Sequence, residues 1–219
     1  MEQRSADADM GRRERTKRET RGRLGDVAAR LFAARGYDEV SMSDLARAAG
    51  VSDQTVYNYF PTKPDLVLDR AEEVLERIRA AVASRAVQQS PADAIRRVVL
   101  EDIDRYVSDD PDLAKGQFPA QCRLSVALRR RALEFYDDVT TAVADELPDT
   151  YSDAMTRRAQ AAALVAVIQQ TTTAIGSAVL DDADRHETRE LLANAATAAL
   201  DNLSHWWTDE PMRWLSQGS

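Results

Sequence analysis

The chain of 219 residues has a single cysteine, Cys122, so no disulfide can form within it. It has only eight glycines, seven prolines and 6% aromatic residues, and little of the two-residue alternation that strands require. No long apolar run and no signal-like N-terminus stands out, from which we expect a cytoplasmic protein that is neither exported nor inserted in a membrane. Abundant alanine, arginine, aspartate and leucine favour helices. The composition therefore predicts an all-α protein.

Residues for catalysis or metal binding are equally scarce. The two histidines, His186 and His205, lack the Glu-x-x-His spacing of a helical di-iron site, and no Cys/His cluster suits zinc. There is no glycine-rich phosphate loop. Cys122 is either a helical packing residue or a redox or ligand contact. We predict no catalytic residues, no metal and no cofactor, which leaves an enzyme as the weakest of three function classes.

The charge is unevenly distributed. The net charge of −8 taken alone argues against a nucleic-acid binder. Residues 1–66, however, carry twelve basic and eleven acidic side chains, which leaves seventeen basic and twenty-six acidic for the rest. Between Arg12 and Arg23 lie seven basic residues and only two acids. This segment is either a solvated tail or an arm that contacts phosphates or the minor groove, and we predict DNA contacts from Arg18, Arg21 and Arg23.

The segment from Ser41 to Lys63, SMSDLARAAGVSDQTVYNYFPTK, has the pattern of two short helices joined by a glycine turn. Ser41 is a suitable N-cap with Asp44 three residues on, and Gly50 supplies the left-handed residue that ends the first helix. Ser52 caps the second helix, whose surface is almost entirely polar. A polar helix held on a small helical scaffold is what entry into the major groove requires.

At this point the sequence resembles the tetracycline-repressor (TetR) family of bacterial transcription regulators, over roughly its first third. The resemblance is carried by these residues: Leu24, Ala28, Leu31, Phe32, Gly36, Tyr37, Ser41, Leu45, Ala46, Ala49, Gly50, Val51, Thr55, Tyr57, Tyr59, Phe60, Lys63 and Leu66. It implies a three-helix helix-turn-helix domain followed by a larger helical domain that binds a ligand and dimerises. Asn58 departs from the family, where many members carry a large aromatic or basic residue, so the operator sequence does not carry over.

The resemblance also implies particular DNA contacts. Ser41, Thr55, Tyr57 and Lys63 match the positions that grip phosphates in the family. Four residues are placed to meet base edges: Ser43, Asp53, Gln54 and Asn58. Asp53 is equally an early-helix acid that favours the helix dipole. Tyr59 either stacks on a sugar or thymine methyl or closes the small core.

Prolines, glycines and caps divide the rest of the chain. We predict a disordered basic arm at 1–15, a DNA-binding domain at 16–64 and a regulatory domain at 65–219. A supporting helix should run over 20–34, a linking helix over 65–87, and further helices over 90–108, 120–147, 152–180 and 184–207, with a short helix near 110–112 and a break at 116–119.

The last two helices carry apolar stripes that serve either the molecule's own core or a dimer interface. The family resemblance implies a four-helix dimer interface, and we assign to it Leu164, Ile168, Ile175, Val179, Leu192, Ala195, Ala196, Ala199, Leu203 and Trp206. A two-fold dimer presents its reading helices about one DNA turn, roughly 34 Å, apart, so the operator should be an inverted repeat in double-stranded DNA.

The resemblance implies an unknown small-molecule effector bound among the middle helices. Six aromatic, amide or hydroxyl side chains are candidates for that site, or else ordinary core and surface: Tyr106, Phe118, Gln121, Phe135, Gln169 and Thr172. We therefore expect a homodimeric repressor that a small molecule releases from its operator, with no membrane partner. The alternative is a helix-turn-helix protein without a ligand, acting architecturally or with a partner.

Overall fold

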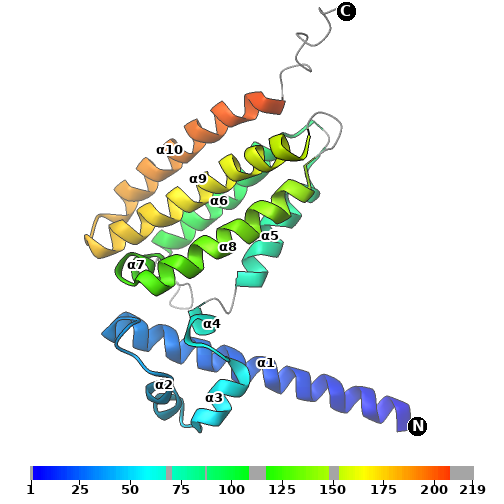
Figure 1. Cartoon of the computed structure of the whole chain (residues 1–219), viewed down its shortest axis with the longest axis vertical. Helices are drawn as coiled ribbons and strands as arrows, with labels where there is room; N and C mark the ends of the chain where they lie inside the picture. The colour runs from blue at the N-terminus through cyan, green and yellow to red at the C-terminus, as the bar shows by residue number, and fades with distance from the viewer. Residues whose placement is uncertain (1, 68–70, 87, 109–116, 148–152, 208–219) are drawn as a thin grey trace, which may run out of the picture. The chain divides into compact units, whose positions relative to one another are not determined.

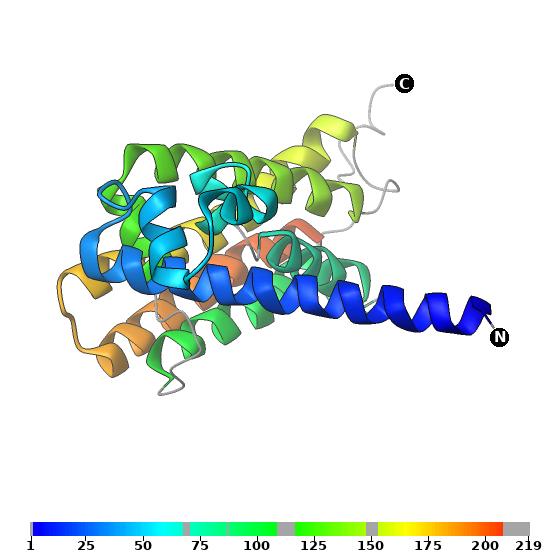
Figure 2. The ribbon, with the colours of Figure 1, turned by 90° about the horizontal axis from the view of Figure 1, so that it is seen from below.

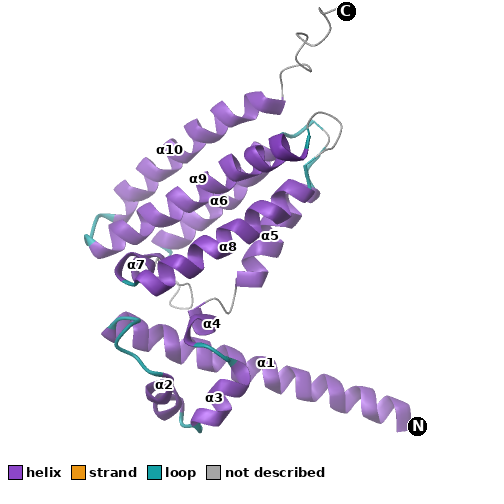
Figure 3. Ribbon diagram, in the orientation of Figure 1, coloured by secondary structure: helices purple, strands orange, loops and turns teal. Residues whose placement is uncertain are grey.

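The computed structural model describes residues 2–67, 71–86, 88–108, 117–147 and 153–207, with side chains from residue 15 onward except at position 117. Within these ranges all regular structure is helical (Figure 3), so the all-α prediction is confirmed. The helices are α1 (Glu2–Arg35), α2 (Met42–Ala49), α3 (Asp53–Tyr59), α4 (Lys63–Val67), α5 (Ala71–Ala83), α6 (Pro91–Val107), α7 (Gln117–Leu124), α8 (Val126–Asp145), α9 (Ala154–Leu180), α10 (Arg185–Ser204) and the 3-10 turn η2 (His205–Trp207).

The chain divides into two compact units, Met1–Arg70 and Ala71–Ser219. In the first unit α2 packs on α1 and α3, and α4 returns to α1. The glycine turn predicted at Gly50 is present, and Gly36 forms another after α1: both residues (φ 68° and 86°) adopt the left-handed conformation that an L side chain disfavours. Ser41 and Asp44 form a complete capping box at the start of α2.

The N-terminal arm differs from the prediction. Residues 2–15 were expected to be disordered because they lack an apolar face, but α1 begins at Glu2 and continues unbroken to Arg35. Figures 1 and 2 show its N-terminal half running beyond α2 and α3. The segment contains no proline and is rich in arginine, glutamate and alanine, whose helix propensities permit this continuation.

The second unit is a helical bundle in which α9 contacts α6, α7, α8 and α10 (Figure 1). Its core is built from aliphatic side chains of all the long helices, with Ile95, Ile103, Val143, Leu164 and Leu200 essentially inaccessible to solvent. The predicted starts and ends of the helices that correspond to α6 and α10 lie within a few residues of the observed ones, since Ser90 and Asp184 cap them.

The middle of the chain corrects two predictions. The break expected at 116–119 is wrong over its described part, because residues 117–119 form the first turn of α7, where a proline ring is tolerated. The single helix expected over 120–147 is two helices, since Ser125 accepts the Leu128 N–H and starts α8 anew. The short helix expected near 110–112, and the cap at Ser152, lie outside the described residues.

Helix α7 sits unusually close to α9. A Cβ placed on Gly176 would lie 2.5 Å from the carbonyl carbon of Pro119 and 2.9 Å from the backbone nitrogen of Ala120. Only a residue without a side chain allows the two backbones to approach this closely. Gly176 therefore fixes the position of α7 on the bundle.

Helix α9 qualifies the expectation that the chain has no long apolar run. By length and composition it could cross a membrane, with a mean hydropathy of 1.5 over its most apolar window. Core helices of soluble proteins satisfy the same test, so this is weak evidence. The contacts of α9 with four neighbouring helices account for its apolar character.

Candidate nucleic-acid interface and ligand cavity

Helix α3 presents a polar surface on a fixed support. Val56 and Phe60 are fully buried in the core of the first unit, whereas Asp53, Gln54 and Asn58 are exposed. Ser52 caps the helix by accepting the Thr55 N–H at 3.1 Å, and its hydroxyl also bonds that of Thr55 at 2.8 Å. The helix is only seven residues long, so its direction is set by these buried side chains and this cap rather than by its own stability.

Two pairs order the side chains predicted to meet bases. The hydroxyl of Ser43 on α2 donates to the carboxylate of Asp53, which ties α2 to the first turn of α3. The Gln54 amide donates to the Asn58 oxygen at 3.0 Å, one turn along α3. The first pair leaves the second carboxylate oxygen of Asp53 for a base edge, and the second leaves the Gln54 side-chain oxygen and the Asn58 side-chain NH2 group. Tyr57 stands next to them with 47% of its surface exposed.

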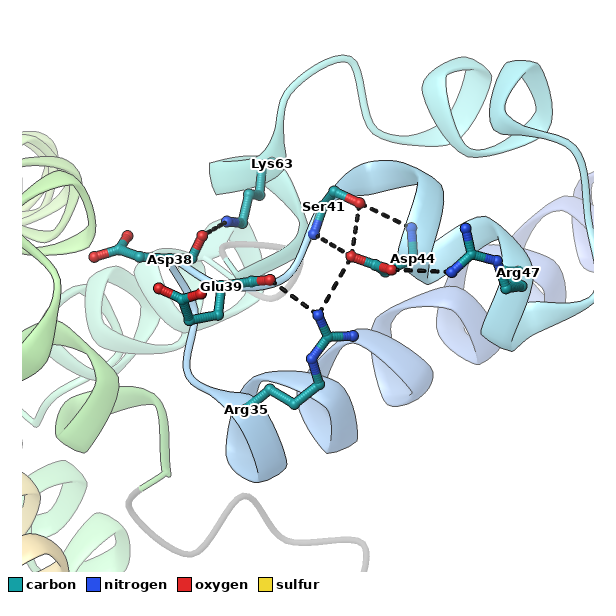
Figure 4. A network of polar contacts seen from close by, with 7 residues as sticks. All are labelled: Arg35, Asp38, Glu39, Ser41, Asp44, Arg47 and Lys63. Atoms are coloured by element: carbon teal, nitrogen blue, oxygen red, sulfur yellow. Dashed lines mark hydrogen bonds and ion pairs between the residues drawn. The ribbon is translucent and has the colours of Figure 1, made fainter.

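The start of α2 holds a polar network (Figure 4). The Ser41 hydroxyl accepts the Asp44 N–H at 3.0 Å and donates to the Asp44 carboxylate at 2.7 Å, while Arg35 and Arg47 form ion pairs with that carboxylate at 3.5 and 3.2 Å. Hydrogen bonds from Ser41, chiefly the backbone one, and the two arginines hold the pKa of Asp44 at about 2. Because the Ser41 hydroxyl proton is already engaged, a phosphate here would be met by the backbone N–H groups of the helix end.

Lys63 is partly committed within its own unit. Its ammonium donates to the carbonyl of Asp38 at 3.3 Å and lies 4.2 Å from the centre of the Tyr37 ring (Figure 4 shows the bond to Asp38). Burial lowers the pKa of Lys63 and is the main cause that raises the pKa of Tyr37 to about 12. An ammonium has three donors, so two remain for a phosphate after the bond to Asp38.

The three predicted contacts on α1 have different surroundings. The Arg21 guanidinium donates to the carbonyl of Tyr59 at 2.8 Å and stacks 4.5 Å from the Phe60 ring, so it anchors the end of α3 rather than standing free as an arm residue. Arg18 is exposed and lies one turn before Arg21 on the same face. Arg23 is exposed and, two residues on, points about 200° away around the helix. Tyr59 is half-buried, which agrees with a role in closing this small core.

The second unit contains a partly open cavity of about 470 Å³ between α7, α8 and α9. Three of the six predicted ligand residues line it: Phe118, Gln169 and Thr172. The other three are placed elsewhere. Tyr106 is buried in the hydrophobic core, Phe135 packs against that core, and Gln121 is buried but is not part of the lining. Adjacent residues of one helix point in different directions around its axis. The sequence alone does not show which of them face the cavity when the helix boundaries are misplaced.

Sequence reasoning missed most of the lining. The residues it did not assign are Pro119, Cys122, Arg123, Arg129, Ala132, Leu133, Tyr136, Gln170 and Thr173. The available signal was the spacing on α8, where positions 129, 132, 133 and 136 fall on one helical face. Burial raises the pKa of the Cys122 thiol to about 12 and also raises the pKa of Tyr136. Both groups are therefore neutral hydrogen-bonding groups at pH 7, and Cys122 is not an activated thiol.

The predicted dimer residues fall into two classes. Leu164, Ile168, Ile175 and Ala196 are buried within the unit's own core, so their assignment to an interface is wrong because no surface remains for a second copy. Val179, Leu192, Ala199 and Leu203 are half-buried, whereas Ala195 and Trp206 are exposed. Ala162 and Ala166 are exposed positions of α9.

In the described residues no group of three or more His, Cys, Asp or Glu side chains could hold a metal ion. The described residues thus have three features that bear on function: the helical fold, the polar surface of α3 and the cavity.

Comparison with known proteins identifies relatives of this chain. The family model for bacterial regulatory proteins of the tetR family matches residues 24–69. The HTH-type transcriptional repressor Rv1474c of Mycobacterium tuberculosis is 31% identical over 137 residues, which is 56% of this chain and 73% of that protein. The HTH-type transcriptional regulator EthR of Mycolicibacterium smegmatis is 30% identical over 109 residues, which is 50% of this chain and 47% of the regulator.

Solved structures agree on the fold. NalD, the secondary repressor of the MexAB-OprM multidrug efflux pump in Pseudomonas aeruginosa, superimposes with a TM-score of 0.57 at 19% identity, covering 84% of this chain and 97% of NalD. At this identity the likeness concerns the fold alone. The chain spans about half or less of the length of several curated relatives, such as EthR (47%) and CymR of Pseudomonas putida (45%).

Proposed function

This chain belongs to the TetR family of bacterial regulatory proteins, and from that premise we propose that it is a transcription regulator that binds double-stranded DNA through α2 and α3. It would bind an operator and repress transcription, and a small-molecule effector would release it from that operator. The observation that carries the proposal is α3 itself, whose polar side chains are exposed while Val56 and Phe60 fix it to the core.

Affinity and sequence preference would come from different side chains. Thr55, Tyr57 and Lys63, with the N-terminal end of α2, would hold phosphates and set affinity. Gln54 and Asn58 would meet base edges, where an amide can pair with adenine in two places. Because these two amides bond each other, the Gln54 oxygen and the Asn58 NH2 group are the atoms left to meet a base. Arg18 would extend the phosphate contacts along α1.

The regulator would act as a homodimer. Helix α9, helix α10 and the turn η2 expose alanines and larger apolar groups, including Ala166 on α9, Leu191 on α10 (63% exposed) and Trp206 in η2 (49% exposed). Alanines let helices approach closely, and two copies paired on this face would read an inverted repeat.

The effector would bind in the cavity between α7, α8 and α9. Its volume of about 470 Å³ lies within the range of small-molecule sites, and its lining mixes apolar surface with a few polar groups. This cavity favours a ligand-responsive regulator over the alternative of a helix-turn-helix protein that acts without a ligand.

The chain from α4 to α5 would carry the signal between the two units. In the second unit α5 is tied to its neighbours by ion pairs, from Arg77 to Asp102 and Glu101 on α6 at 2.6 and 3.5 Å and from Arg79 to Glu146 after α8 at 2.6 Å. A shift of α8 on effector binding would therefore move α5 with it.

The test is a binding titration of the purified protein against DNA that flanks its own gene, at several salt concentrations, followed by footprinting. We expect a protected inverted repeat, affinity that falls as salt rises, and a salt slope reduced by about one when Lys63 is replaced by alanine. Tyr57→Phe, which removes only a hydroxyl, should weaken binding on all sequences alike. The matched control is Arg30→Gln, which removes one positive charge from an exposed position on α1. Unchanged affinity in both test variants would refute the proposed docking.

A further inference from the structure

We propose that the cavity between α7, α8 and α9 selects organic anions, namely carboxylic acids with an aromatic or aliphatic body. This inference rests on the proposed function, since it assigns a chemical class to the effector. It starts from the charges that line the cavity, which are Arg123 and Arg129 with no carboxylate among the twelve lining residues.

A cationic lining is notable in this part of the molecule. Residues 67–219 carry seventeen basic and twenty-six acidic side chains, so a cavity lined at random would hold more acids than bases. Elsewhere in the second unit, arginines such as Arg77, Arg79 and Arg158 form ion pairs with carboxylates. Within the described residues neither cavity arginine has such a pair. Their positive charge is available to a ligand.

The two arginines have different roles. Arg129 is held in place, because its guanidinium donates to the carbonyls of Cys122 at 3.4 Å and Arg123 at 2.8 Å at the end of α7. The Arg123 side chain is exposed and has no carboxylate or hydrogen-bond partner in the described part of the chain. A preoriented guanidinium beside a free one can hold the two oxygens of a carboxylate, the geometry for which arginine is best suited.

The start of α8 adds to this positive field. Helix α8 is twenty residues long, begins at Val126 and has no acidic residue in its first turn. Arg129 is its fourth residue, so the positive end of the helix dipole lies beside the same part of the cavity. The carbonyls at the C-terminal end of α7 offset part of this dipole, so a carboxylate near Arg129 would be stabilised chiefly by the two guanidiniums.

The remainder of the lining defines the body of the ligand. Phe118, Ala132 and Leu133 give apolar surface, and Gln169 and Thr172 provide polar groups beside Tyr136. Arg129 and Tyr136 are seven residues apart on α8, a rise of about 10 Å. The Thr172 hydroxyl already donates to the carbonyl of Ile168 at 2.8 Å, so it can only accept from a ligand. The lining on α8 therefore extends over about 10 Å of that helix.

Other ligand classes suit this lining less well. A cation would face two guanidiniums without a counter-charge, which disfavours binding. A neutral amphiphile would fill the apolar part but would displace water from the arginines without replacing its hydrogen bonds.

The experiment is calorimetric titration of the full-length protein with cinnamate, phenylbutyrate and octanoate, each compared with its primary amide. The amide keeps size and shape and removes the charge. We expect at least one acid to bind with a dissociation constant below about 1 mM, and its amide to bind at least about tenfold more weakly. The acid should also slow modification of Cys122 by a methanethiosulfonate reagent, because this single cysteine lies in the cavity lining.

Arg123→Gln should weaken the acid about tenfold and leave the amide unchanged. Its control is Arg130→Gln, which removes the same charge from α8. The Arg130 side chain forms an ion pair with Glu134 and is not part of the cavity lining. The comparison of acid with amide needs no variant, so it decides the matter even where a variant fails to fold. Equal affinity for acid and amide, no binding of any acid, or binding that leaves Cys122 unprotected would overturn the proposal.

DNA binding in the absence of ligand separates this inference from the proposed function. Specific DNA binding without discrimination between acid and amide refutes the anion site alone. Discrimination without any specific DNA binding supports the anion site and refutes the proposed DNA docking.

Discussion

Gly176 is the position where a single methyl group has the most predictable effect. An alanine Cβ there would lie 2.5 and 2.6 Å from the carbonyl carbon and oxygen of Pro119, and both contacts are backbone atoms that no rotamer change can relieve. Normal carbon contacts are about 3.5–4.0 Å, so α7 has to move by about 1 Å. Overpacking of this kind costs about 1–3 kcal/mol, at the upper end when backbone is involved.

The better helix propensity of alanine offsets part of this cost, by about 1 kcal/mol. The net loss should be about 1–2 kcal/mol, which for a chain of this size lowers the melting temperature by about 2–8 °C. Tryptophan fluorescence is a suitable readout, because Trp206 and Trp207 lie in η2 of the second unit. Displacement of α7 should also make the thiol of Cys122 more reactive, since α7 forms that wall of the cavity.

Gly22→Ala is the matched control. Gly22 is also inside a helix, but nothing lies within 4 Å of the Cβ that it would gain. There only the propensity gain applies, so the variant should be more stable by about 0.5–1 kcal/mol, measured by calorimetry. A Gly176→Ala protein as stable as the parent would refute the close approach of α7 and α9.

Three further predictions concern the interface, the capping network and the linking helix. Ala166→Arg should convert a dimer to monomers in analytical ultracentrifugation, whereas Ala80→Arg, exposed on α5, should not; dimers that persist in both would exclude the proposed face. The pKa of Asp44 is lowered from 3.8 to about 2 in the folded protein, so its stabilising effect is present above about pH 4 and lost as the pH falls toward 2. The difference in free energy of unfolding between the parent and Asp44→Asn should therefore shrink as the pH falls from about 4 to about 2. A difference that stays constant over this range would contradict the prediction. Arg77→Ala should cost about 1–2 kcal/mol in urea unfolding because it removes the bonds from Arg77 to both oxygens of the half-buried Asp102 carboxylate on α6, which then keeps only its 3.4 Å contact with Arg105. Arg97→Ala, exposed on α6, should cost almost nothing; equal effects would argue against the ion pair.

The interactions that the sequence determined are local ones. Ser41, Ser90 and Asp184 cap helices by reaching N–H groups three residues away, and Gly50 ends α2 by its own conformational freedom. Such interactions depend on spacing along the chain, so they can be read without a structure. The helix-turn-helix and the family were predictable for this reason.

The structure decided everything that depends on contacts between distant segments. The apolar residues of α9 lie on more than one face, and only the packing of α6, α7, α8 and α10 shows that Leu164 and Ile168 face inward while Ala166 faces out. Arg21 reads as an arm residue in the sequence, yet its partner is Tyr59, thirty-eight positions later.

The cavity illustrates the same limit. Its arginines, Arg123 and Arg129, lie on two helices that the sequence pattern joins into one, because the cap at Ser125 that separates them is indistinguishable from a serine inside a helix. Helical periodicity assigns a face to each residue only within one unbroken helix. Local physics along the chain therefore determined the DNA-reading segment, whereas the tertiary packing of α7, α8 and α9 alone created the cavity and its charge.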